Sequence, residues 1–158
     1  MYKRQVLAEK YSFTNEPVHL LGFSMGGSFA THAAALPDAP WKSLTVIASF
    51  GSLEKVIDSQ APDFIEEQLC NRIASRGGIH PSKVVPEELA ERVKIPLLQL
   101  HGVEDQLIPI EQARDYHARF GSLEKEFVEI PDAGHDNVLV TPMEVYAHMV
   151  RFVLSVGE

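Results

Sequence analysis

A serine framed by glycines is the chain's clearest candidate for a nucleophile. Ser24 is the centre of GFSMG at Gly22–Gly26, which follows the apolar run 18–21 and precedes small, helix-compatible residues. A strand, a sharp turn and a helix in this order are the setting in which Gly-x-Ser-x-Gly forms a nucleophile elbow. The apolar run predicts a strand buried on both faces. The turn should raise the Ser24 hydroxyl above the sheet, beside the free N–H groups at the start of the helix.

The glycines of this motif are expected to be a steric requirement. A turn this sharp places Ser24 in an unusual backbone conformation. We expect a side chain at either Gly22 or Gly26 to collide with the neighbouring strand or helix.

Two later motifs could supply the base and the acid that a serine nucleophile needs. A hydroxyl reacts poorly near neutral pH until a base removes its proton, and a carboxylate best holds that base in the right tautomer. The motif HGVED offers Asp105, and the motif AGH offers His135, each directly after a predicted strand. The chain order Ser24, Asp105, His135 is the order expected when an elbow serine opens a hydrolase.

Other carboxylates and another histidine compete for these roles. Glu104 and Asp136 are the obvious alternative carboxylates. On an extended loop Glu104 points away from its neighbour Asp105. His101 stands at a strand end rather than in a loop that could reach Ser24, and we expect it to shape its turn.

The remaining histidines indicate no metal or cofactor. They have no partner at a spacing typical of metal ligands, such as His-Glu-x-x-His. They are His19, His32, His80, His117 and His148. The sequence therefore predicts chemistry without a cofactor and without a metal ion.

Composition narrows the class of protein and its partners. At 158 residues the chain, 1–158, is predicted to be a single domain, and its net charge of −8 argues against nucleic acid as a partner. Cys70 is the only cysteine, so no intrachain disulfide can form. No apolar run approaches the length of a membrane span. We expect a cytoplasmic protein that acts on a small molecule; any N-terminal signal would lie upstream of the chain, and the sequence indicates no oligomeric state.

Alternating strands and helices predict an α/β fold, with a mostly parallel sheet and helices on both faces. The expected strands are residues 18–21, 44–48, 97–101 and 126–130, and the expected helices are residues 25–36, 110–120 and a last one from about residue 142. Residues 51–94 are longer than a plain crossover requires. We predict that they form a small helical insertion, or lid, over the site.

The first five residues look foreign to the rest of the chain. MYKRQ is what one reading frame of a transposase-type sequencing adapter would encode. We therefore interpret residues 1–5 as a non-native leader and expect the gene to extend upstream.

The three motifs together resemble the α/β-hydrolase superfamily. GFSMGG, HGxxDxxxP and AGH stand in its order, separated by about 80 and about 30 residues. The resemblance is nearest to the lysophospholipase, esterase and serine-aminopeptidase-like branch. It implies Ser24 as nucleophile, Asp105 as acid, His135 as base and the Met25 backbone N–H as one half of an oxyanion hole.

The resemblance covers only the C-terminal part of that fold, from about residue 6 onward. Members of the superfamily have several strands before the elbow, and a loop after one of them supplies the second oxyanion donor. The resemblance thus implies a fold truncated at its N-terminus, with N-terminal strands missing and an unpaired apolar strand edge. Because one lost oxyanion donor costs roughly 10²–10³ in rate, we expect this chain alone to fold poorly and to be weakly active or inactive.

The leading hypothesis is a serine hydrolase that cleaves an ester, a thioester or a small amide through an acyl-enzyme. Phe23, Phe50 and the insertion 51–94 would set the size of the substrate. The alternative is a non-catalytic relative that binds a small molecule or a protein partner through the same pocket.

Overall fold

The computed structural model describes residues 17–38, 40–140 and 144–156, and its centre is a four-stranded parallel sheet. The strands are β1 (Val18–Phe23), β2 (Trp41–Ile47), β3 (Leu97–Gly102) and β4 (Lys125–Ile130), and they pair in the order β1-β2-β3-β4. Because all four strands are parallel, their carboxyl ends lie at one edge of the sheet. The loops that follow them therefore gather at that edge.

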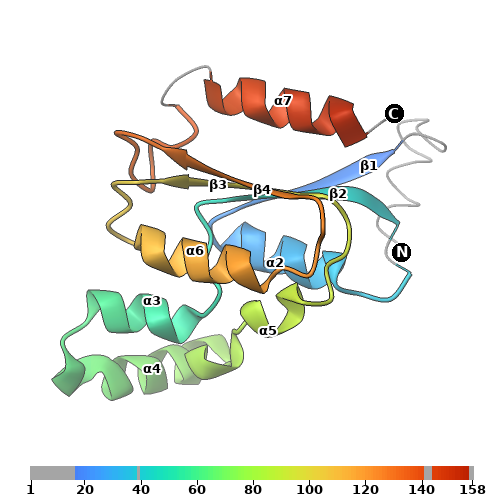
Figure 1. The fold of residues 1–158 in the computed structure, drawn as a ribbon. Helices are drawn as coiled ribbons and strands as arrows, with labels where there is room; N and C mark the ends of the chain where they lie inside the picture. Colours follow the sequence, from blue (N-terminus) through green and yellow to red (C-terminus); the bar gives the residue numbers. More distant parts are fainter. Residues whose placement is uncertain (1–16, 39, 141–143, 157–158) are drawn as a thin grey trace.

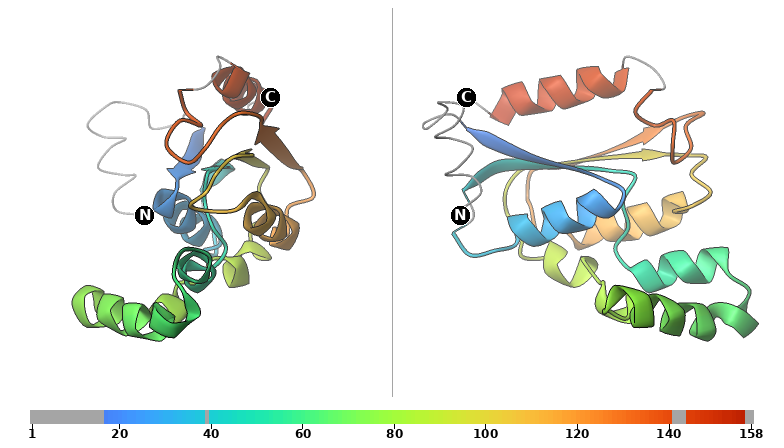
Figure 2. Two further views of the ribbon diagram at one scale, coloured as in Figure 1. Left: turned by 90° about the vertical axis from the view of Figure 1, so that its left-hand side faces the viewer. Right: turned by 180° about the vertical axis from the view of Figure 1, so that it is seen from behind.

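Helices connect the strands as a parallel sheet requires. They are α2 (Met25–Ala34), α3 (Leu53–Gln60), α4 (Asp63–Gly77), the 3-10 turn η1 (Pro81–Lys83), α5 (Glu87–Ala90), α6 (Ile110–Arg119) and α7 (Glu144–Val156). Helices α2, α5 and α6 lie on one side of the sheet, and α7 lies on the other (Figure 1). Helices α2 and α6 run side by side beneath the strands (Figure 2). Among the helices that the structure describes, none combines the length and the apolar character needed to cross a membrane.

The core is divided between the two faces of the sheet. On the face of α2 and α6, Leu44 and Val46 of β2 pack against Ala30 and Tyr116. Ile47 of the same strand belongs instead to the cluster beneath α7, which includes Leu98, Leu100, Val145 and Phe152. This alternation along one strand is the period-2 pattern of a sheet covered on both sides. It confirms the predicted α/β architecture.

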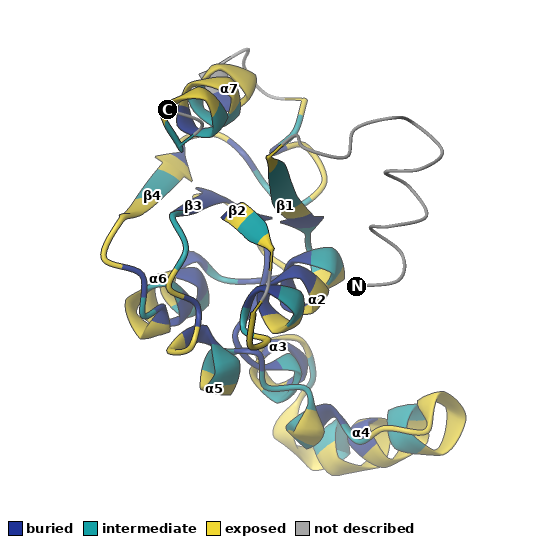
Figure 3. Ribbon diagram, turned by 90° about the vertical axis from the view of Figure 1, so that its right-hand side faces the viewer, coloured by how far each residue is buried: buried dark blue, intermediate teal, exposed yellow. Residues whose placement is uncertain are grey.

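Strand β1 differs from the expected strand buried on both faces. It lies at an edge of the described sheet, most of it is half-exposed, and Leu21 is 54% exposed. By contrast, β3 is buried throughout and β2 is buried from Ser43 onward, whereas much of β1 has the teal of half-buried residues in Figure 3. The physical reason is that α7 packs against β2 and β3. The apolar run thus predicted a strand correctly, but the prediction that this strand is buried on both faces was wrong.

Most predicted elements occur close to their predicted positions. The four strands are present, with β2 beginning earlier than expected, at Trp41. Residues 51–94 contain α3, α4, η1 and α5. That they form an insertion or lid over the site stays a prediction. The proposed leader, 1–5, lies outside the described residues.

Candidate active site

The turn after β1 holds Ser24 in a strained conformation. Ser24 has φ 51° and ψ −123°, in the region of positive φ that non-glycine residues rarely adopt. Its N–H donates to the carbonyl of Ile47 at 2.8 Å, and its carbonyl accepts from the N–H of Gly27 at 3.0 Å. The same residue thus ends the strand and caps the helix. A strained turn between a strand and a helix is the geometry that the Gly-x-Ser-x-Gly motif predicted here.

The glycines around Ser24 differ in how much space surrounds them, and the expected collision at Gly26 does not occur. A Cβ at Gly22 would lie 2.3 Å from the carbonyl oxygen of Gly26, and one at Gly27 would lie 2.5 Å from the side chain of Ser49. A Cβ at Gly26 would meet nothing within 4 Å, and Gly26 does not have positive φ. The expectation of a collision at Gly26 was therefore wrong. The close approach is between the end of β1 and the start of α2, and Gly22 is where it occurs.

Alanine at Gly22 should therefore destabilise the protein far more than alanine at Gly26. The Gly22→Ala variant must move backbone, and we expect it to cost about 3 kcal/mol or more of unfolding free energy. Gly26→Ala should leave Tm unchanged or raise it, because alanine is favoured over glycine in a helix by about 1 kcal/mol. Thermal melts of the two variants measure this. Equal losses at both positions would contradict the geometry.

The loop after β3 presents Asp105 in a buried and well-bonded position. Its Oδ1 accepts the N–H groups of Leu107 at 2.9 Å and Ile108 at 2.8 Å. The side chain has no exposed surface, so its second oxygen is held inside the protein. These two backbone bonds fix the orientation of the carboxylate group.

The loop after β4 presents His135 next to Asp105 because the two loops touch. The N–H of Glu104 donates to the carbonyl of Ala133 at 2.9 Å. A Cβ at Gly102 would lie 2.2 Å from that same carbonyl, so glycine at the end of β3 permits the contact. Within the His135 loop, the side chain of Asn137 accepts the N–H of Gly134 at 2.6 Å.

Ser24, His135 and Asp105 form one continuous chain of hydrogen bonds. His135 Nδ1 donates to Asp105 Oδ2 at 2.8 Å, which leaves Nε2 free to accept the Ser24 hydroxyl at 3.0 Å. Phe23 lies beside the imidazole, with ring centroids 5.4 Å apart. The arrangement can move a proton from the hydroxyl to the ring while the carboxylate faces the positive charge that forms.

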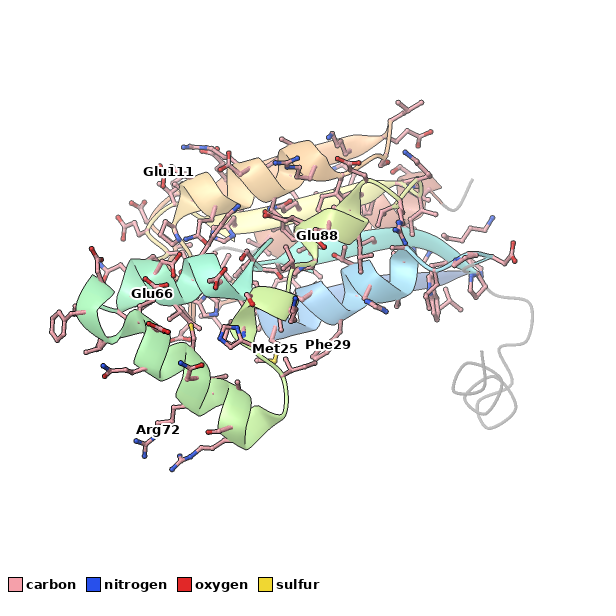
Figure 4. All side chains as sticks on the ribbon, turned by 90° about the horizontal axis from the view of Figure 1, so that it is seen from below. Met25, Phe29, Glu66, Arg72, Glu88 and Glu111 are labelled. Carbon is pink, nitrogen blue, oxygen red and sulfur yellow. The ribbon has the colours of Figure 1, made fainter. Side chains whose placement is uncertain are left out.

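The other predicted site residues have distinct places. Met25 is the first residue of α2, so its N–H belongs to the group of helix donors without an intrahelical partner. Its side chain and that of Phe29 are exposed and project from α2 near each other (Figure 4). Phe50 is buried with Val56 and Ile108, beneath α3. Contact of Phe23 or Phe50 with a substrate stays a prediction.

A cavity of about 600 Å³ opens beside His135. The loops after β3 and β4 form most of its wall, and Gln60 of α3 completes it. Both competing carboxylates, Glu104 and Asp136, line this cavity, whereas Asp105 Oδ2 is the carboxylate oxygen that bonds to the His135 ring.

Two residues near the site were not assigned to it from the sequence. The side chain of Gln60 donates to the carbonyl of Gln106 at 2.6 Å, so the insertion is tied to the loop of the acid. The ring of His101 lies with its Nε2 3.4 Å from Asp105 Oδ2. Its spacing of four residues from Asp105 was the available signal; nothing in the sequence points to Gln60.

The chain is similar to known proteins in structure, but no protein-family model and no curated protein matches its sequence. Among solved structures, an esterase from Pyrococcus furiosus has a TM-score of 0.73 at 16% identity, over 98% of this chain and 59% of the esterase. The acetyl xylan esterase 1 of a Thermoanaerobacterium species has a TM-score of 0.66 at 22% identity, over 92% of this chain and 47% of that one.

A protein assigned as a non-heme bromoperoxidase, from Mycobacterium tuberculosis, has a TM-score of 0.65 at 17% identity, over 97% of this chain and 72% of that one. The chain has the α/β-hydrolase fold. It spans between 47% and 72% of the lengths of these three structures. The hydrogen-bonded chain of Ser24, His135 and Asp105 lies at the carboxyl ends of the strands.

Proposed function

We propose that the protein is a serine hydrolase that cleaves an ester, a thioester or a small amide. The observation that carries the proposal is the continuous bonding of Ser24 Oγ to His135 Nε2 at 3.0 Å and of His135 Nδ1 to Asp105 Oδ2 at 2.8 Å. The esterases among the similar structures support the same class of reaction.

The mechanism follows from the order of these contacts. As Ser24 Oγ attacks the acyl carbonyl carbon, His135 Nε2 takes the hydroxyl proton and Asp105 stabilises the imidazolium. The oxyanion that forms accepts the N–H of Met25, at the positive end of α2. His135 then gives the proton to the leaving group, and the acyl group stays on Ser24. Water repeats the sequence, releases the acid and restores the hydroxyl.

We also propose that turnover by this 158-residue chain is slow. Within the described residues, the Met25 N–H is the oxyanion donor that we identify. Removal of one donor from an oxyanion hole lowers kcat by roughly 10²–10³. The resemblance implies a second donor from a loop before the elbow strand, and residues 1–16 lie outside the described part of the chain.

Labelling with a fluorophosphonate tests the proposed nucleophile. This reagent phosphonylates an activated serine, and mass spectrometry of the digested protein identifies the modified residue. We expect one adduct, on Ser24, and none in the Ser24→Ala variant. A folded chain that stays unlabelled would contradict the proposal and favour a protein that binds its ligand without catalysis.

A further inference from the structure

The ring of His101 is placed to control the loop that carries Asp105. His101 is the fifth residue of β3, and its side chain is fully buried. Its Nε2 lies 2.8 Å from the carbonyl oxygen of Ile108 and 3.4 Å from Asp105 Oδ2. One ring nitrogen of His101 thus meets both the far end of the loop and the carboxylate.

The partners of His101 fix where its proton is. A carbonyl oxygen only accepts, so Nε2 carries the hydrogen and donates it to Ile108. The other ring nitrogen, Nδ1, is then an acceptor; it is buried and has no hydrogen-bond partner among the described residues. An apolar side chain at this position would avoid that cost. The imidazole is therefore poorly explained as a packing residue alone.

The bond from His101 completes a clamp around Asp105. Both backbone polar groups of Ile108 are hydrogen-bonded: its N–H donates to Asp105 Oδ1 at 2.8 Å, and its carbonyl accepts from His101. The N–H of Leu107 occupies the same Oδ1 at 2.9 Å. With Oδ1 fixed in this way, Oδ2 is left to face His135.

Burial keeps His101 neutral. Burial lowers the pKa of the His101 imidazole, and the nearby His135 ring lowers it further. The Ile108 carbonyl, Asp105 and Glu129 raise that pKa, but the effect of burial is larger. Glu129 on β4 is itself engaged by Arg114, at 2.8 Å. A protonated His101 would be a cation beside Asp105 Oδ2 and would compete with His135 for that oxygen. The neutral ring donates its single proton mainly to the backbone.

We propose that His101 is a positioning residue that holds the loop 102–108 and so aims Asp105 at His135. The inference rests on the proposed serine hydrolase function. Loss of the clamp should let the carboxylate rotate, weaken its bond to His135 and slow attack by Ser24. A displacement of about 1 Å in such a group can cost about 10²-fold in rate.

Two variants separate positioning from packing. His101→Leu removes the donor, and we expect the rate of fluorophosphonate labelling to fall about 10- to 100-fold. His101→Gln returns an N–H near the position of Nε2, and we expect labelling within about threefold of the unsubstituted chain. If the leucine variant does not fold, His101→Asn replaces it, because its shorter amide cannot reach Ile108.

The proton spectrum gives a readout that a purely structural role would not move. The low-field proton resonance of the His135–Asp105 bond should weaken in His101→Leu and return in His101→Gln. His117→Leu is the matched control, since His117 stacks on Phe127 and also has a buried Nδ1 without a partner among the described residues.

The outcomes are distinct. Fast labelling and an unchanged proton resonance in a folded His101→Leu variant would overturn the inference and leave the proposed function standing. An unsubstituted chain that is folded and unlabelled would overturn the proposed function. In that case the proton resonance still tests whether His101 orients Asp105, because it does not depend on turnover.

Discussion

Alanine at either Ser24 or His135 is expected to lower the turnover of p-nitrophenyl acetate by about 10⁶-fold or to the rate in buffer, whichever is reached first. In the proposed mechanism the two groups perform one step together: Ser24 Oγ becomes reactive as it loses its proton to His135 Nε2, 3.0 Å away. The double variant should therefore be no slower than either single variant. Initial rates at saturating substrate, measured with purified protein, give the comparison.

Matched controls exclude a general effect of the substitutions. Ser75→Ala removes a hydroxyl that donates to the Arg72 carbonyl of its own helix, and His148→Ala removes an imidazole from α7. Both should keep the rate of the unsubstituted chain. A double variant whose loss equals the product of the two single losses would show that Ser24 and His135 act independently, and would contradict the mechanism.

The strands and helices were predictable because the pattern that specifies each is local. The apolar run before Ser24, the glycine at position 22 and the small residues after it determine a strand, a turn and a helix within about twenty positions. The parallel arrangement followed from the alternation of strands with helices. The same local reasoning placed Asp105 and His135 in loops at the ends of strands, which a parallel sheet brings to one edge.

The environment of β1 was not predictable in the same way. Whether an apolar strand is covered on both faces depends on which distant helix packs over it, and α7 lies over β2 and β3. The open space around Gly26 could not be predicted for a similar reason. The sequence identifies a glycine, and only the placement of the surrounding atoms tells whether a side chain would meet them.

The supporting contacts of the site join segments that are remote in the sequence. Gln60 reaches the carbonyl of Gln106, and the Glu104 N–H reaches the carbonyl of Ala133. These bonds depend on how loops approach one another, which no periodicity encodes. The sequence predicted that His101 shapes its turn, but its bond to the Ile108 carbonyl depends on the fold of the intervening loop, which turns Ile108 back toward the ring.

Replacing Asp105 with asparagine should lower kcat by about 10⁴-fold while preserving the fold. The asparagine Oδ1 can still accept the N–H groups of Leu107 and Ile108, so its NH₂ group must take the place of Oδ2 and face His135. Two donors cannot bond, and the ring then favours the tautomer with its proton on Nε2. That tautomer cannot accept the hydroxyl proton of Ser24.

The loss at Asp105 should appear in kcat with little change in KM, because the carboxylate acts on the base rather than on the substrate. Asp115→Asn, an isosteric change on the exposed face of α6, is the control and should keep the original rate. Rates across the pH range, with a thermal melt of each variant, complete the measurement. If Asp105→Asn retains its activity in a folded protein, then the tautomer of His135 is set by another group, and the 2.8 Å bond between His135 and Asp105 does not carry the chemistry assigned to it.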